Sequence, residues 1–365
     1  MFEINQSNLC EFAENGDLDN LKLICKYLDK NGKNEEYDLD IAGCHHTHRW
    51  DKYKNFAIRR ACLNGHLPVV RYLIVNYPEV DITAYNNYMI RWACKNGHID
   101  LVVYLLENYP QIDITAYNND AIIWACHNGH IDIVVYLLEN YPEIDITAKN
   151  SYAICGACEG GHIDMVVYLL ENYPEVDITA DNNSAIQLAC QNGHFPVVKY
   201  LLGNYPEVDI TADNNYPIRG ACEEGHTDIV VYLLENYPEV DITDNNNYAI
   251  FRACEEERLP IVVYLIMTCL KKILDKESDM YCINKIVDLL IEYDEKTVFY
   301  VFKQELKKRN IQIDMDEDIE KMEEQIEMER KLFIELEHHP QLLNGQMGIK
   351  CKEGLDSAMD IVGKM

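Results

Sequence analysis

"NNYMIRWACKNGHIDLVVYLLENYPQIDIT" (residues 86–115) holds the signals for two helices and the connection that follows them. Residues 86–97 predict a short helix ending at Gly97, because glycine commonly follows a helix C-terminus. Residues 99–109 place apolar side chains at i, i+3, i+4 and i+7, the spacing of an amphipathic helix. Pro110 ends this second helix, and the Asp-Ile-Thr stretch alternates in polarity up to a turn-forming Asn-Asn pair. The stretch therefore predicts a helix, a turn, a second helix and an extended finger.

The same pattern recurs along the chain at a fixed interval. Its Gly-His pair repeats every 32 residues, with histidines at His66, His98, His130, His162, His194 and His226. Arg258 takes the next position of the series, and an imperfect copy begins near Asp17. A sustained period near 33 predicts a solenoid, in which each repeat buries its apolar face only against its neighbours.

The pattern A-[AC]-x-N-G-H-x-[DE]-[IV]-V-x-[YL]-L-L, followed by a hydrophobic–Asp finger, resembles the ankyrin repeat over about residues 1–274. The resemblance implies an all-α, ankyrin-type helix-turn-helix solenoid of period 32. The family's T-P-L-H is replaced here by segments such as Tyr-Ala-Ile-Cys at 152–155, and its Gly-Ala-Asp by Tyr-Pro-Glu. The lost T-P-L-H histidine leaves open how neighbouring repeats are hydrogen-bonded. The Asn-Tyr-Pro-Glu-Val-Asp-Ile-Thr segment and the composition are similar to the repeat arrays of giant DNA viruses of amoebae (mimivirus-like arrays).

Interruptions of the period divide the chain into four expected segments. These are a divergent N-terminal repeat with an extended finger loop (1–50), seven ankyrin-like repeats (51–274), a degenerate helical cap (275–315), and an acidic helix and tail (316–365). Leu270 replaces the proline that ends the second helix elsewhere, so that helix is expected to continue. An acidic C-terminal helix over 316–339 is expected to dock on the cap through Ile319, Met322, Ile326, Phe333 and Leu336.

An insertion lengthens the first interval of the series and contains GCHHTHRWDKYKN at 43–55. The sequence favours a solvent-exposed recognition loop here. A zinc site made of Cys44, His45, His46 and His48 is the alternative, although these residues are crowded and no second spaced pair of ligands accompanies them.

Composition limits the classes of function. The net charge of −30 argues against nucleic acid or an anionic membrane as the main partner. No stretch approaches 18 apolar residues and no secretory signal is visible, so we expect a location in the cytoplasm, the host cytoplasm if the protein is viral. We also expect a monomer. The richness in Asn, Ile, Tyr and Asp is attributed in part to an AT-rich genome.

Half of the fourteen cysteines occupy one position of the repeat, from Cys62 to Cys254, four residues before the histidine of the series. One thiol per repeat cannot supply the four close ligands of a structural zinc site, whereas a buried free cysteine packs as a small hydrophobe. We therefore predict packing for this column, and neither a metal nor a cofactor for the protein.

Positions that differ among the repeats are candidates for partner recognition, because stacking needs the constant ones. In ankyrin repeats, the finger tip and the exposed side of the first helix line the concave face. Trp92 and Trp124 share one such position in adjacent repeats, and interfaces concentrate Trp, Tyr and Arg. Later repeats carry acidic residues instead. The predicted partner-binding residues are Tyr85, Arg91, Trp92, Lys95, Tyr117, Trp124, His127, Asp213, Glu223 and Glu255.

These features predict a non-enzymatic scaffold that binds a protein partner. One alternative is an adaptor whose C-terminal helices recruit a degradation or assembly machine. The other is an enzyme with its chemistry in the C-terminal region or the 43–55 loop. Neither segment has a glycine-rich phosphate loop, a spaced metal set or a nucleophile with an obvious base.

Overall fold

The computed structural model describes residues 6–31, 49–78, 80–275, 280–293, 295–309, 311, 313 and 319–328. Helices and turns account for these residues, without strands, which confirms the predicted all-α solenoid fold. The chain forms two compact units: residues 1–189 with 199–208 (unit 1), and residues 190–198 with 209–365 (unit 2).

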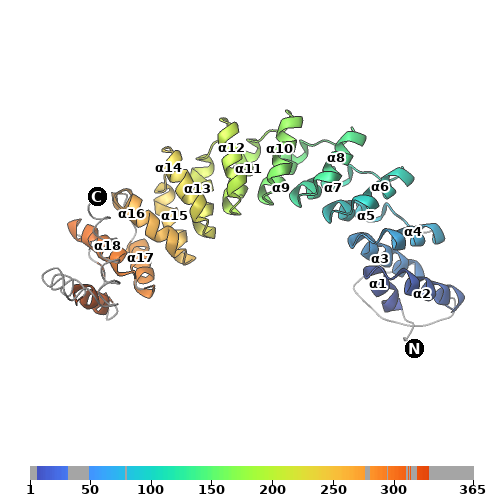
Figure 1. Ribbon diagram of the computed structural model, residues 1–365, viewed down its shortest axis with the longest axis horizontal. Helices are drawn as coiled ribbons and strands as arrows, with labels where there is room; N and C mark the ends of the chain where they lie inside the picture. Colours follow the sequence, from blue (N-terminus) through green and yellow to red (C-terminus); the bar gives the residue numbers. More distant parts are fainter. Residues whose placement is uncertain are drawn as a thin grey trace, which may run out of the picture. The chain divides into compact units, whose positions relative to one another are not determined.

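Unit 1 is built from pairs of helices in two layers (Figure 1). Neighbouring first helices contact each other from α1 to α9, and second helices do so between α2 and α4 and between α6 and α8. The helices are α1 (Gln6–Glu14), α2 (Leu18–Asn31), α3 (Arg49–Leu63), α4 (Leu67–Asn76), α5 (Ala84–Lys95), α6 (Ile99–Asn108), α7 (Ala116–His127), α8 (Ile131–Asn140), α9 (Ala148–Glu159) and α10 (Ile163–Asn172). The boundary between the units passes through α11 (Ala180–Gln191) and α12 (Phe195–Asn204).

Unit 2 continues the pairing in α13 (Ala212–Glu224), α14 (Thr227–Asn236), α15 (Asp244–Glu255) and α16 (Leu259–Asp275). As predicted, α16 runs past Leu270, whose side chain is buried. Two further helices, α17 (Met280–Glu292) and α18 (Lys296–Lys308), contact α15 and α16 respectively, so they cover the last repeat.

The predicted acidic helix is helical over its described part, residues 319–328. Ile319 and Met322 are buried, and Glu323 forms an ion pair with Lys303 of α18. The ion pair places this part of the helix beside α18. Residues 329–365 lie outside the described residues, as do residues 43–48 with Cys44, His45, His46 and His48. The rest of the predicted recognition loop, residues 49–55, is the first half of α3 and not a loop.

The core repeats one set of side chains. Leu101, Val102 and Leu105 of α6 pack against Ala93 and Cys94 of α5, all at most 1% exposed, and the same positions are buried in the following repeats. The predicted packing role of the cysteine column is confirmed, because the cysteines from Cys62 to Cys254 in this column are buried.

The predicted extended finger is instead a compact turn. Tyr85, Asn86 and Asn87 have φ angles of 57°, 56° and 57°, the left-handed region that asparagine tolerates better than most residues. The Asn87 amide donates to the Thr83 carbonyl at 2.9 Å, which closes the turn. Most repeats have such a turn. The abundance of asparagine thus has a structural cause that composition did not reveal.

The third residue of this turn also links neighbouring repeats. Asn87 is 8% exposed, and its Oδ1 accepts a hydrogen bond from the Asp113 amide at 3.1 Å. Equivalent bonds join the pairs Asn119–Asp145, Ser151–Asp177 and Asn215–Asp241.

The Gly-His pair forms a second link. Nε2 of His130 donates to the Lys95 carbonyl of the preceding repeat at 3.0 Å. The His130 ring lies so close to Gly97 that a Cβ there would stand 2.6 Å from it. His66, His98, His162 and His226 form the same bond, and the Arg258 guanidinium replaces histidine in the last repeat. These histidines therefore form hydrogen bonds between neighbouring repeats, although the T-P-L-H histidine of the family is missing.

Burial of the cysteine column predicts that its thiols react slowly with thiol reagents. Desolvation raises the pKa of the Cys94 and Cys126 thiols well above the ordinary value, and the thiolate is the reactive form. At about pH 8, a thiol reagent should label the half-buried Cys10 and Cys269 before any member of the column, and denaturant should expose the column. Mass spectrometry of the labelled peptides measures this order. Fast labelling of Cys94, Cys126 or Cys158 in the folded protein would contradict their packing between helices.

Candidate functional site

Two tyrosines protrude from the left-handed turns of adjacent repeats in unit 1. Tyr85 is 65% exposed and Tyr117 is 61% exposed. Their φ angles of 57° and 63° are unfavourable for an aromatic residue, and each turn is held closed by a backbone hydrogen bond of 2.9 Å. The rings are thus presented from fixed positions.

The two tryptophans enclose a lysine. Nζ of Lys95 lies 4.6 Å from the centroid of the Trp92 ring and 3.8 Å from that of Trp124. Both tryptophans are half-buried, although their repeat position is expected on the exposed side of the first helix. His127 meets Trp124 edge-on, with centroids 5.4 Å apart, and its Nδ1 lies 3.5 Å from a Glu159 carboxylate oxygen.

Arg91 contacts other residues of the repeat array. Its guanidinium lies 2.7 Å from a carboxylate oxygen of Asp120, and the two side chains are only 15% and 13% exposed. Lys149 of the following repeat approaches the same carboxylate at 3.7 Å. The guanidinium also stacks over the Tyr117 ring, 5.0 Å from its centroid. Arg91 therefore orients Tyr117, and its positive charge is neutralised by Asp120.

Sequence reasoning missed Asp120, although a signal was present. Asp120 is the one acidic residue at its position, which holds Tyr88, Tyr152, Ser184, Tyr216 and Tyr248 in other repeats. The acidic residue lies in the repeat that follows the arginine, and it stands about one helical turn nearer the start of its own helix. This spacing indicates an ion pair between stacked helices.

Arg59 was also missed. It precedes Arg91 by one period, and its guanidinium lies 4.6 Å from the centroid of the Tyr85 ring and 5.9 Å from that of Tyr88. Phe56 is a third ring near this guanidinium, at 5.7 Å. The Tyr88 ring in turn packs at 5.3 Å from Trp92, which joins the two clusters. We call this group the aromatic–basic surface: Phe56, Arg59, Tyr85, Tyr88, Trp92, Lys95, Tyr117 and Trp124.

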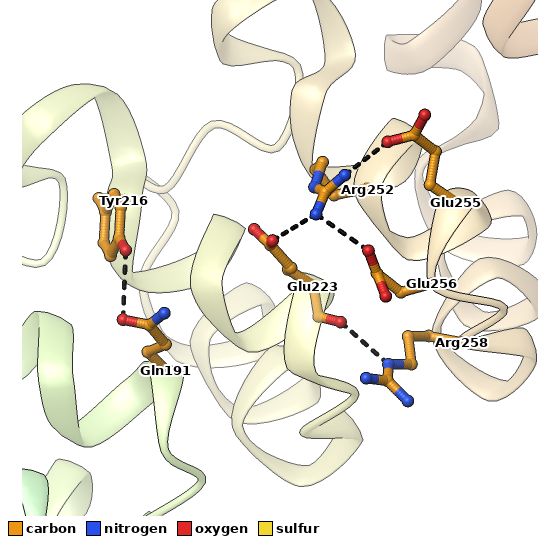
Figure 2. A network of polar contacts seen from close by, with 7 residues as sticks. All are labelled: Gln191, Tyr216, Glu223, Arg252, Glu255, Glu256 and Arg258. Carbon is orange, nitrogen blue, oxygen red and sulfur yellow. Dashed lines mark hydrogen bonds and ion pairs between the residues drawn. The ribbon is translucent and has the colours of Figure 1, made fainter.

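Three glutamates of unit 2 surround an arginine (Figure 2). Arg252 lies 2.5 Å from Glu223, 2.5 Å from Glu255 and 3.0 Å from Glu256. Hydrogen bonds to Glu223 and then Glu255 raise the pKa of Arg252. Glu223 and Glu255 are thus paired and not free negative charges.

Asp213 lies apart from this cluster, in the left-handed turn at the start of α13 with a φ angle of 52°. Its backbone carbonyl accepts a hydrogen bond from Arg219 at 3.2 Å. Of the predicted residues, the structure therefore brings together Tyr85, Arg91, Trp92, Lys95, Tyr117, Trp124 and His127 in unit 1, and Glu223 with Glu255 in unit 2.

Within the part of the chain that the structure describes, no group of three or more His, Cys, Asp or Glu side chains is placed to hold a metal ion. In the same residues, no helix is both long and apolar enough to cross a membrane.

Comparison with known proteins supports the repeat architecture. Family models described as "Ankyrin repeats (3 copies)" match residues 58–150 and 143–214, and one described as "Ankyrin repeats (many copies)" matches residues 220–266. Together these matches take in more than half of the chain. The crystal structure of the human ASB11 ankyrin repeat domain is similar, with 18% sequence identity and a TM-score of 0.40. That match covers 53% of this chain and 95% of that one. No curated protein sequence matches this chain.

Proposed function

Because this chain belongs to the ankyrin-repeat family, we propose that it is a non-enzymatic scaffold that binds a protein partner through the aromatic–basic surface. Ankyrin repeats are in general protein–protein interaction modules, which supports a protein as the partner. We also propose that it acts as a monomer in the cytoplasm, and in the host cytoplasm if its likeness to viral arrays reflects its source.

The observation that carries this proposal is the exposure of Tyr85 and Tyr117 on strained turns. A residue held in the left-handed region costs about 1–3 kcal/mol, and such strain concentrates at binding sites. Asparagine avoids most of this cost, and it occupies the same position in the last repeat as Asn245. Two adjacent repeats thus carry exposed tyrosine at a position where another repeat carries a better-suited residue.

Rigidity makes these rings efficient contacts. Tyrosine and tryptophan dominate the energies of protein interfaces, and groups already fixed in place lose little entropy on binding. Arg59 lies over Tyr85 and Arg91 lies over Tyr117, so a cation of the preceding repeat packs against each ring. The surface therefore offers apolar area, ring faces and hydrogen-bond donors together.

The double variant Tyr85→Asn/Tyr117→Asn tests the proposal. It removes both rings but suits the left-handed turn, so thermal stability should stay unchanged or rise. Binding of the partner should weaken by at least about 2 kcal/mol if these rings are hot spots. The partner would be isolated by affinity capture with mass spectrometry, and its binding measured by calorimetry.

The matched control is Asp181→Asn, which changes the same turn position in a repeat without the aromatic cluster and should leave binding intact. Truncation of Trp92 and Trp124 is a less direct test, because both side chains are half-buried and their removal should also reduce stability. Unchanged binding by the double tyrosine variant would show that the aromatic–basic surface does not bind the partner.

A further inference from the structure

The cations of unit 1 differ in whether a carboxylate neutralises them. Arg60 pairs with Glu14 at 3.2 Å, and Arg91 pairs with Asp120. Arg59 and Lys95 lie at the centre of the aromatic–basic surface, yet no carboxylate among the described residues lies within ion-pair distance of either. Arg59 donates to the Asn55 carbonyl at 3.1 Å, and Lys95 contacts the two indole rings.

This lack of partners stands out against the composition. The chain has 62 acidic residues and 32 basic ones, so carboxylates are plentiful. Aromatic faces attract a cation but leave its charge and most of its N–H donors available to a further group. Half-buried cations beside apolar rings also bind a carboxylate more strongly than cations in open water.

Resting on the proposed function, we propose that the segment bound at this surface is acidic: Asp or Glu carboxylates pair with Arg59 and Lys95, and neighbouring apolar side chains pack on Tyr85 and Tyr117. A basic segment would meet two cations with no compensating carboxylate. By contrast, Arg252 of unit 2 is already paired with Glu223, Glu255 and Glu256.

The positions of the two cations set the spacing of the acidic residues. Arg59 and Lys95 lie on adjacent first helices, which are separated by roughly 10 Å, and about one helical turn apart along the helix direction. The separation of about 12 Å corresponds to three or four residues of an extended peptide at roughly 3.3 Å each. Because residues at even spacing share one face of an extended peptide, we expect the motif [DE]-x-x-x-[DE], with aromatic or aliphatic residues beside it.

A phage-displayed library of random dodecapeptides, panned against the full-length protein, tests this inference. Selected peptides would be synthesised with a fluorescein label and measured by fluorescence anisotropy. The test variant is Arg59→Gln/Lys95→Gln, and glutamine occurs naturally at both repeat positions, as Gln187 and Gln191. The control is Arg71→Gln, because Arg71 also lies over a tyrosine ring, at 4.6 Å from the Tyr104 centroid, but outside the surface.

The expected result is enrichment of the acidic motif, with roughly 10-fold weaker binding to the test variant and unchanged binding to the control. Thermal melts of all three proteins verify that they are folded. Enrichment of basic or uncharged peptides, or acidic peptides that bind the test variant normally, overturns the inference. If such peptides still lose affinity for Tyr85→Asn/Tyr117→Asn, the proposed function stands without the inference. If the tyrosine variant binds every selected peptide normally, the proposed function fails as well.

Discussion

Replacement of Gly97 by alanine is expected to lower the free energy of unfolding by about 3 kcal/mol, because it acts on two features at once. Gly97 has a φ angle of 78°, where an L-residue with a Cβ costs roughly 1–2 kcal/mol. The new Cβ would also stand 2.6 Å from the His130 ring. The ring must then move, which weakens its 3.0 Å hydrogen bond to the Lys95 carbonyl, worth about 1 kcal/mol.

Gly203→Ala is the matched control, and it is expected to raise the free energy of unfolding instead of lowering it. Gly203 lies near the end of α12, and nothing is found within 4 Å of the position that its Cβ would take. Alanine should therefore stabilise the helix by roughly 0.5–1 kcal/mol, since glycine loses more conformational freedom on folding. Urea unfolding followed by circular dichroism compares the two variants. Equal midpoints for Gly97→Ala and the unmodified protein would show that the Gly-His link does not stabilise the stack.

Asp120→Ser should destabilise the protein by about 2–4 kcal/mol, because it leaves the poorly exposed guanidinium of Arg91 without its carboxylate. Removal of one member of a buried ion pair costs more than the pair itself contributes. The loss should be larger than for Glu14→Ala, since Glu14 and Arg60 form a pair that is 45% and 40% exposed.

The double variant Arg91→Ile/Asp120→Ser separates this explanation from a general packing defect. Both new residues occur at the same repeat positions elsewhere, as Ile123 and Ser184. If the cost arises from an unpaired charge, the second substitution should recover most of the lost stability. Thermal unfolding of the four proteins completes a double-mutant cycle. A double variant as unstable as the sum of its parts would contradict the ion-pair account.

The repeat architecture was predictable because it depends on periodic burial. The second helix expected over 99–109 is α6 at Ile99–Asn108, and the cysteine column is buried as predicted. The left-handed turn at Tyr85–Asn87 was not predictable from apolar alternation. The turn is closed locally by the Asn87–Thr83 backbone hydrogen bond, and its third residue also accepts from the Asp113 amide, a bond that exists only when repeats stack.

The sequence predicted which side chains of the candidate site are neighbours, but not how their charges pair. Columns of the repeat predicted that Trp92, Trp124 and Lys95 are neighbours, and in the structure Lys95 Nζ lies 4.6 Å and 3.8 Å from the centroids of the two rings. They did not show that Arg91 is neutralised by Asp120 or that Arg252 gathers Glu223 and Glu255. Both ion pairs between repeats join residues 29 positions apart. A search for opposite charges at that offset would have found them from the sequence alone.

The two links between repeats also have a genetic consequence. At His98, His130, His162 and His226, the histidine reaches a carbonyl 35 residues earlier. In four repeats, the buried turn residue accepts from an amide 26 residues later. A gene segment encoding one whole repeat can therefore be copied or lost by recombination, and the new junction has matching donors and acceptors. Each copied segment also brings its own recognition residues to a new place in the order. A lineage that carries this gene can thus acquire new binding specificities by reshuffling whole repeats, without first accumulating point mutations in the stacked core.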